Sequence, residues 1–480
     1  MEAQPQRRRG HHGHVALIAL AAALSAAALR AALLLDDPWA HGYDGWYYVL
    51  QVRALLDGAP LFADRSLVFA PLTALAALTG DAILGNKLAA IGFAAITAAA
   101  GAVAGWRWSG SRTAAAAAGM WWALSPLHLS LTAEFLKNSA GMAVLALLLA
   151  ALPRCERHRR TLAVVMGLAL LGPLVHKLTG VLGLLAAGGY ATAQVTRGHT
   201  IPRWLWITAG VGVAAVMAAG LLRPADLARL LGSDGGTTTR IAAFWSRRLI
   251  FPERIALVAI HLAPLAVAVL AWRPRHRPLA LTLLPLSIAA LGPGLSFGWD
   301  GLAWRLMLMG FVAAGIAYSV IAPRVTAAIV VVVGVGQAPV LVSALQARSP
   351  DYVAWATAIP VIQGTIPAGD RVIAHRGLCG FVWAEADIIC ENFQPPTPHE
   401  RWWRIAYGFG PHRFEPYVQD GEPAPVSARP GYTIVWEPHW QQFLDAEGET
   451  FLLARDPRNP FRVRPTFVYG PGEETPSVER

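Results

Sequence analysis

Charged side chains are scarce in this sequence, and cysteine is scarcer still. Only 15% of the 480 residues are Asp, Glu, Lys or Arg, whereas 55% are hydrophobic, and the mean hydropathy is +0.43. This balance excludes an ordinary soluble domain and predicts an integral membrane protein. The three cysteines, Cys155, Cys379 and Cys390, do not have the paired spacing that is typical of zinc sites.

The net charge of +10 would raise the question of nucleic acid binding in a soluble protein. Here the arginines fall largely in short segments between apolar runs, and basic loops of this kind set the orientation of a membrane protein. We therefore expect no nucleic acid partner.

Long apolar runs predict a mainly α, polytopic transmembrane helical bundle over residues 15–346. The first run follows Arg7, Arg8 and Arg9, and its length of about 21 residues indicates an uncleaved span and not a signal peptide. We expect eleven spans: 15–35, 84–105, 113–131, 134–152, 161–175, 178–196, 203–222, 255–272, 278–292, 302–322 and 324–343.

The basic clusters between the runs predict how the chain is oriented. They all fall on one side, which is cytoplasmic by the positive-inside rule. This gives a cytoplasmic N-terminal tail, residues 1–14, and places the outer loop 36–83 and the C-terminal region on the opposite face of what we expect to be a bacterial cytoplasmic membrane.

From residue 347 to residue 480 the composition changes, and no run is long enough to span. We expect a small extracytoplasmic α/β domain here, periplasmic or extracellular. Its predicted elements are strands at 370–375, 387–390 and 432–436 and a helix at 377–386. Cys379 and Cys390 lie in this domain, where a disulfide is permitted, and a bridge and two buried thiols remain equally open.

The outer loop 36–83 is acidic, aromatic and rich in turn residues. Apolar side chains recur at helical spacing within it, at Tyr48, Val52, Leu55 and Ala59, so residues 45–58 are predicted to form an amphipathic helix on the outer membrane surface. A second short apolar segment, 66–79, is predicted to lie along the interface or to re-enter partly.

Asp44 immediately precedes the predicted amphipathic helix, and two roles are open for it. It could be an N-cap, whose side chain accepts a backbone N–H of the first turn. It could also be a base that takes a proton from an acceptor hydroxyl at the membrane surface. Asp36 and Asp37 end the first span and are interfacial acids that could support the reaction.

Four basic side chains are predicted at the outer ends of spans: Lys137, His176, Lys177 and Arg305. Each could simply reach toward the lipid headgroups. Together they are more than the orientation rule predicts for short outer loops, and they favour an anionic ligand such as a lipid phosphate.

The later spans contain almost no ionisable residues between their ends, unlike ion-coupled transporters. Arg30 is close enough to the end of the first span to be expected at the interface. This pattern favours chemistry at the outer surface over transport across the membrane.

The layout resembles the GT-C glycosyltransferases, which include protein O-mannosyltransferases, lipid A aminoarabinose transferases and oligosaccharyltransferases. The resemblance rests on the first span, the segment Tyr43-Asp44-Gly45-Trp46-Tyr47-Tyr48 in the outer loop, the many spans and the external C-terminal domain. It implies transfer of a sugar from a polyprenyl phosphate or diphosphate at the outer face, with Asp44 in the position of the loop acid that serves the reaction. The Asp-Glu pair of protein mannosyltransferases and the Trp-Trp-Asp signature of oligosaccharyltransferases are absent, so the subfamily stays open.

We therefore predict a membrane glycosyltransferase with Asp44 as the base and Lys137, Lys177 and Arg305 as phosphate ligands. His176 is a weaker candidate for either task. The acceptor is a glycan, a lipid or a protein. We expect no metal site from ligand spacing, although Asp36, Asp37 and Asp44 could hold a divalent cation. The alternatives are a flippase for a lipid-linked intermediate and a non-catalytic envelope assembly protein.

Aromatic side chains in two places could bind a sugar ring. Trp46, Tyr47 and Tyr48 could stack on the sugar or anchor in the headgroup region. In the C-terminal domain, a second set could form a sugar platform, although burial in the core is favoured: Trp402, Trp403, Tyr407, Phe409 and His412.

Overall fold

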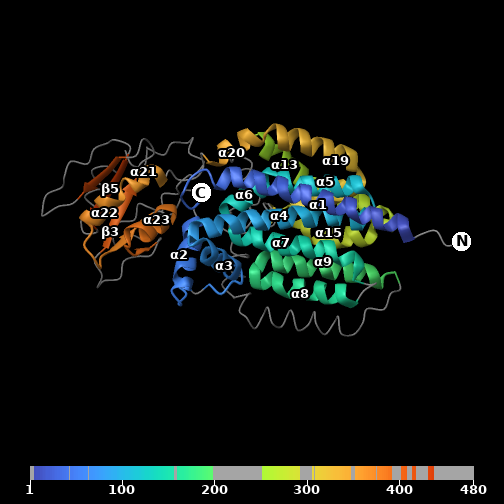
Figure 1. Cartoon of the computed structure of the whole chain (residues 1–480). Coiled ribbons are helices and arrows are strands. Elements are labelled where there is room, and N and C mark those ends of the chain that lie inside the picture. Colours follow the sequence, from blue (N-terminus) through green and yellow to red (C-terminus); the bar gives the residue numbers. More distant parts are fainter. Residues whose placement is uncertain are drawn as a thin grey trace. The chain divides into compact units, whose positions relative to one another are not determined.

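The computed structural model describes most of the chain, as coloured ribbons in Figure 1. The described residues are 5–42, 44–62, 64–155, 159–197, 251–291, 305–307, 309–346, 352–374, 376–391, 402–407, 413–417 and 431–436. The chain divides into two compact units. The first contains Met1–Pro38 and Ala63–Gln346, and the second contains Trp39–Phe62 and Ala347–Arg480.

The first unit is helical. Its α-helices are α1 (Pro5–Leu34), α3 (Phe69–Thr79), α4 (Ala82–Ser109), α5 (Arg112–Leu124), α6 (Pro126–Glu134), α7 (Leu136–Ala151), α8 (Arg159–Val175), α9 (Lys177–Val195), α13 (Phe251–His261), α14 (Ala263–Trp272), α15 (Arg277–Ala289), α18 (Phe311–Ile321), α19 (Pro323–Val330) and α20 (Ala338–Gln346). Short 3-10 turns follow α7 and α14, and a π-helical segment, η3 (Val331–Val335), continues α19.

Local signals in the sequence explain where these helices begin and end. The Asp81 side chain caps α4 by accepting the backbone N–H of Ile83 at 2.7 Å, and Gly110, with a φ of +74°, ends the same helix. Ser111 then caps α5. Such short turns place successive helices side by side, as α4 and α5 are in Figure 1.

Five helices among the described residues are long and apolar enough to span a membrane: Gly13–Leu34, Ala82–Ser109, Leu136–Arg154, Lys177–Val195 and Phe251–Trp272. A sixth span is possible if α19 with η3 and α20, which meet at a bend of 50°, form one broken crossing. The predicted count of eleven is not confirmed. The run 113–131 is interrupted at Ser125, α8 and α15 are short, and the run 203–222 lies outside the described residues.

Small residues bring the helices of the first unit close together. A Cβ added at Gly101 of α4 would lie 2.5 Å from the Trp122 ring of α5, and one at Gly119 would lie 2.9 Å from the Cβ atoms of Ala22 and Ala102. Small residues allow two helix backbones in a membrane to approach closely. Close packing matters there because lipid tails are as apolar as leucine, so the hydrophobic effect does not drive helices together. The core of this unit is accordingly rich in alanine.

Arg30 is wrongly predicted at the membrane interface, because its side chain is fully buried. The chain breaks between α5 and α6, where Pro126 has no N–H to donate to the Trp122 carbonyl. His128 Nδ1 lies 2.9 Å from that carbonyl oxygen, and Arg30 donates to the carbonyl of Ala123 and lies 3.1 Å from the same His128 nitrogen. The two side chains thus pair with the carbonyl groups that the break exposes.

The second unit contains a five-stranded mixed sheet of order β2-β1-β3-β5-β4. Its strands are β1 (Arg371–Ile373), β2 (Cys390–Glu391), β3 (Trp402–Tyr407), β4 (Arg413–Tyr417) and β5 (Gly431–Trp436), and its helices are α2 (Gly45–Leu56), α21 (Tyr352–Ala356), α22 (Ile359–Thr365) and α23 (Arg376–Ala386). β1 runs parallel to β2 and β3, β3 runs antiparallel to β5, and β5 runs parallel to β4.

The predicted elements of the C-terminal region match this sheet in part. β1, α23 and β5 coincide with predicted ranges, and β2 begins only at the last residue of the range 387–390. β3 and β4 were not predicted. Cys379 of α23 and Cys390 of β2 form a disulfide, which resolves the choice between a bridge and two thiols.

The helix α2 belongs to the core of the second unit. A helix is correctly predicted after Asp44, but its apolar face packs on α23. Trp46 is fully buried, with ring centroids 5.3 Å from Phe381 and 5.6 Å from Tyr352. A Cβ at Gly380 would lie 2.5 Å from the Trp46 Cβ. Trp46 therefore cannot stack on a sugar or anchor among headgroups in this structure.

The neighbouring aromatics are also engaged within the second unit. The Tyr47 ring stacks on Phe62 at 4.8 Å, and Tyr48 is buried. Trp402 and Trp403 are buried too, and the Trp403 indole donates to Asp370 at 2.8 Å, which favours a structural role over a sugar platform. Phe409 and His412 lie outside the described residues, and so does the side chain of Tyr407.

Candidate functional site

Asp44 belongs to the second unit and immediately precedes α2. Gly42 adopts a φ of +71°, and the Tyr352 hydroxyl donates to the Gly42 carbonyl oxygen at 3.3 Å. The Asp44 side chain is 9% exposed and forms no capping hydrogen bond with α2. The N-cap interpretation is therefore wrong, whereas the catalytic interpretation remains a prediction.

Asp36 and Asp37 have structural partners in the first unit. The Gln346 amide donates to an Asp36 carboxylate oxygen at 2.9 Å. Lys87, which is buried near the start of α4, donates to the Asp37 backbone carbonyl at 2.5 Å and lies 3.5 Å from its carboxylate. The Lys87 contact holds the segment after α1 against α4, and the Gln346 contact holds it against α20. Lys87 was missed in the sequence, where its position inside an apolar run is the signal that could have marked it.

Lys137 lies in the first turn of α7, immediately after a break in the helix. Phe135 leaves the helical conformation, with φ −134° and ψ 71°, and separates α6 from α7. The Lys137 ammonium forms an ion pair with Asp64 and lies 5.6 Å from the centroid of the Phe69 ring. Both charged side chains are about one-fifth exposed. Asp64 was not singled out from the sequence.

The segment that carries Asp64 is attached to the end of α8. An Asp64 oxygen accepts the Ser66 backbone N–H at 3.0 Å, a turn in which an aspartate binds the backbone two residues later. The Ser66 hydroxyl donates to the Val175 carbonyl at 2.6 Å, and the Leu67 N–H donates to the Leu174 carbonyl at 3.0 Å. The residues Asp64-Arg65-Ser66 carry the local signal for this turn.

His176 caps the start of α9, one residue after α8 ends. Its Nδ1 accepts the Thr179 N–H at 3.3 Å, so a neutral His176 carries its proton on Nε2. Burial, and then the positive charges of Arg305 and Lys137, lower the pKa of His176 to about 3. His176 is therefore neutral at physiological pH. The same effect indicates that Arg305 and Lys137 are near enough to influence one imidazole.

Arg305 and Lys177 differ in their surroundings. The Arg305 guanidinium lies over the Phe135 ring, with its carbon 4.7 Å from the ring centroid, so it approaches the same helix break that precedes Lys137. Lys177 is the first residue of α9, and its side chain is exposed. The structure thus gathers Lys137, His176 and Arg305, with Asp64 as an additional member. We call these four residues the cationic cluster.

Asp44 belongs to the second unit, and the cationic cluster belongs to the first. Their meeting in one site stays a prediction. Within the described residues, no three His, Cys, Asp or Glu side chains are grouped in a way that could hold a metal ion, which gives no support to a divalent cation held by Asp36, Asp37 and Asp44.

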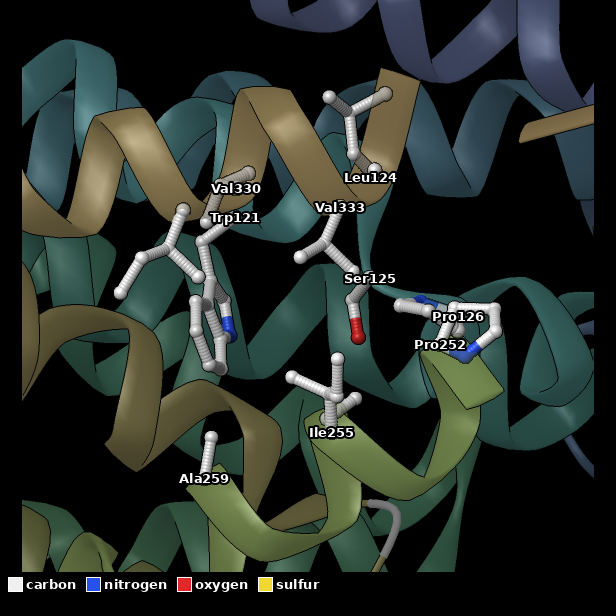
Figure 2. A pocket seen from close by; sticks show the side chains of 12 residues that line it. Trp121, Leu124, Ser125, Pro126, Pro252, Ile255, Ala259, Val330 and Val333 are labelled. Carbon is white, nitrogen blue, oxygen red and sulfur yellow. The ribbon is translucent and has the colours of Figure 1, made fainter. Parts of the chain in front are cut away.

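An apolar pocket of about 50 Å³ lies beside the break between α5 and α6. Figure 2 shows side chains of this break, of α13 and of the helix formed by α19 and η3 around it. None of its lining side chains is charged, and the Ser125 hydroxyl contributes an oxygen. A Cβ at Gly334 would lie 2.6 Å from the Leu124 Cβ, so glycine allows η3 to approach α5 here.

Among solved structures, the chain is similar to ArnT from Cupriavidus metallidurans bound to undecaprenyl phosphate. The match covers 82% of this chain and 92% of that chain, with a TM-score of 0.52 and 10% sequence identity. The resemblance expected from the sequence is thus confirmed for the fold. No protein family and no curated protein matches the sequence.

Proposed function

We propose that this protein is a membrane glycosyltransferase. It transfers a sugar from a polyprenyl-phosphate-type donor to a glycan, lipid or protein acceptor at the outer face of the cytoplasmic membrane. The observation that carries the proposal is the cationic cluster, in which Lys137 and Arg305 lie near one neutral histidine at the ends of apolar helices. The fold shared with ArnT, a protein solved with undecaprenyl phosphate, supports the same ligand class.

The chemistry assigns a task to each side chain. The acceptor oxygen forms a bond to the anomeric carbon of the sugar, and Asp44 takes the proton of the acceptor hydroxyl. The bond from the sugar to the phosphate breaks, and its electron pair leaves on the phosphate oxygen. Lys137 and Arg305 stabilise that negative charge, with Lys177 as a further cation.

His176 contributes to the same task as a neutral donor. Its Nδ1 is occupied by the Thr179 N–H, so the Nε2–H is the group that can donate to a phosphate oxygen.

The test is sugar transfer by the purified protein with the variant Asp44→Asn. We expect transfer to be lost while expression, membrane insertion and binding of a prenyl phosphate stay normal, because the amide has nearly the same shape but cannot take the proton. Asp57→Asn is the matched control, since Asp57 is an exposed carboxylate at the other end of α2. Near-normal turnover by Asp44→Asn would sink the assignment of the base.

Two outcomes would favour the other functional classes. A flippase would move the lipid-linked intermediate across a vesicle membrane without consuming it. An assembly protein would lose neither activity nor lipid-phosphate binding when Lys137 and Arg305 are both replaced by alanine.

A further inference from the structure

Asp64 is an unexpected member of a site that is proposed to bind an anion. Its carboxylate forms an ion pair with Lys137, a proposed phosphate ligand. A phosphate that reaches Lys137 therefore meets a negative charge beside it. The question is what a carboxylate contributes at this position.

Hydrogen bonds and an ion pair fix the position of the Asp64 side chain. One carboxylate oxygen accepts the Ser66 N–H, and the other faces Lys137. Ser66 and Leu67 are in turn bound to the last carbonyl groups of α8, next to His176. The segment thus holds the carboxylate within the cationic cluster.

The charges of the cluster determine how strongly it attracts each kind of phosphate. Lys137 and Arg305 contribute two positive charges, Asp64 contributes one negative charge, and His176 is neutral, so these four side chains carry a net charge of +1. A sugar linked to a lipid through one phosphate is a phosphodiester with a charge of −1. The lipid phosphate that remains after transfer is a monoester, whose second pKa is about 6, and it carries nearly −2 above neutral pH.

We propose that Asp64 is a charge-selecting residue that reduces the preference of the cationic cluster for the doubly charged phosphate product over the singly charged phosphodiester donor. This inference rests on the proposed function and deepens it. Asp64 repels the product more strongly than the donor, because the Coulomb energy scales with the charge of the ligand. Asp64 thereby limits how tightly the lipid phosphate is held after transfer of the sugar, and promotes its release. For the same reason, Asp64 lowers the affinity for a lipid diphosphate, with its additional charge, more than the affinity for the phosphodiester.

The test uses two probes that differ by one charge: farnesyl phosphate and its methyl ester, both at pH 8. The affinity of each is measured for the wild-type protein in detergent and for Asp64→Asn. The asparagine oxygen can still accept the Ser66 N–H, so the segment is preserved. We expect an affinity gain of about threefold for the methyl ester and, because the factor is squared for a doubly charged ligand, of about tenfold for farnesyl phosphate.

Two further variants make the result specific to charge. Asp64→Glu keeps the carboxylate and should keep the wild-type ratio of the two affinities. This variant tests the proposal even if Asp64→Asn folds poorly. Lys137→Ala should lower the affinity for both probes. An equal gain for both probes, or a loss for both, in Asp64→Asn would overturn the role of Asp64 and leave the proposed function standing. A wild-type protein that binds neither probe would overturn both.

Discussion

The Tyr352 hydroxyl donates a hydrogen bond to the Gly42 carbonyl oxygen, and 310 residues of sequence separate the two. Gly42, with its positive φ, lies two residues before Asp44, and Tyr352 is the first residue of α21. The same ring packs on Phe381 at 5.2 Å. The segment with the proposed base is therefore held by the C-terminal part of the chain.

Replacement of Gly141 should damage the proposed phosphate site without changing a charged residue. A Cβ at this position of α7 would overlap the Thr179 hydroxyl and lie 2.9 Å from the His176 Cβ. We expect Gly141→Ala to destabilise the protein by about 1–3 kcal/mol and to weaken binding of farnesyl phosphate. Gly167→Ala in α8 is the matched control, because nothing lies within 4 Å of its added methyl group. Equal affinities in the two variants would contradict this packing.

The stability of the protein should depend on pH through His176. Burial and the charges of Arg305 and Lys137 hold the pKa of His176 at about 3, below the ordinary value near 6.5 that the unfolded chain retains. Between these values the unfolded state binds the proton and the folded state does not, so stability falls as the pH drops below about 6.5. We expect His176→Asn to lose less thermal stability than wild type between pH 7 and pH 5, as measured in detergent. An unchanged difference would refute the assignment.

Arg30 should be structurally essential although no catalytic task is assigned to it. Its guanidinium pairs with the Ala123 carbonyl and approaches His128 inside the bundle. Arg30→Met removes these contacts and leaves a buried carbonyl unpaired, at a cost of about 3 kcal/mol in unfolding free energy. The measurement is thermal unfolding in detergent. Leu24→Met, an exposed position on the same helix, should unfold as wild type does.

The disulfide should stabilise the second unit alone. Cys379 and Cys390 close a loop across 11 residues, for which the chain-entropy argument gives about 3 kcal/mol. The double variant Cys379→Ser with Cys390→Ser should lower the unfolding temperature of this unit, and reducing agent should have the same effect on wild type. Cys155→Ser, at a cysteine that forms no disulfide, should have no such effect. A disulfide-free protein of unchanged stability would contradict the prediction.

The features that the sequence predicted well depend on neighbours in the chain. The apolar runs of α1, α4, α7 and α9 are recognisable from composition and length, and the helix after Asp44 from its periodicity. The basic residues at helix ends were found for the same reason. Two of them, Lys137 and Arg305, both act on His176 in the structure.

The features that were missed depend on contacts between distant segments. A helix with one apolar face looks the same whether that face meets a membrane or another helix, so α2 was expected on the membrane surface and not against α23. Asp64 gains its significance only from Lys137, 73 residues later. Arg30 is buried because Pro126 interrupts a different helix, and nothing near Arg30 in the sequence indicates this.

The second unit is formed by two segments that lie far apart in the chain, and this affects the order in which it can fold during synthesis. Arg53 of α2 donates to the Ala384 carbonyl of α23, 331 residues further along. At a synthesis rate of about 5–20 residues per second, α2 leaves the ribosome roughly 15–65 s before its partner. During this interval the face that contains Trp46 and Val49 has no α23 to cover it. This face therefore stays uncovered by α23 until α23 has been synthesised, and a chain truncated after Gln346 would lack α23 altogether.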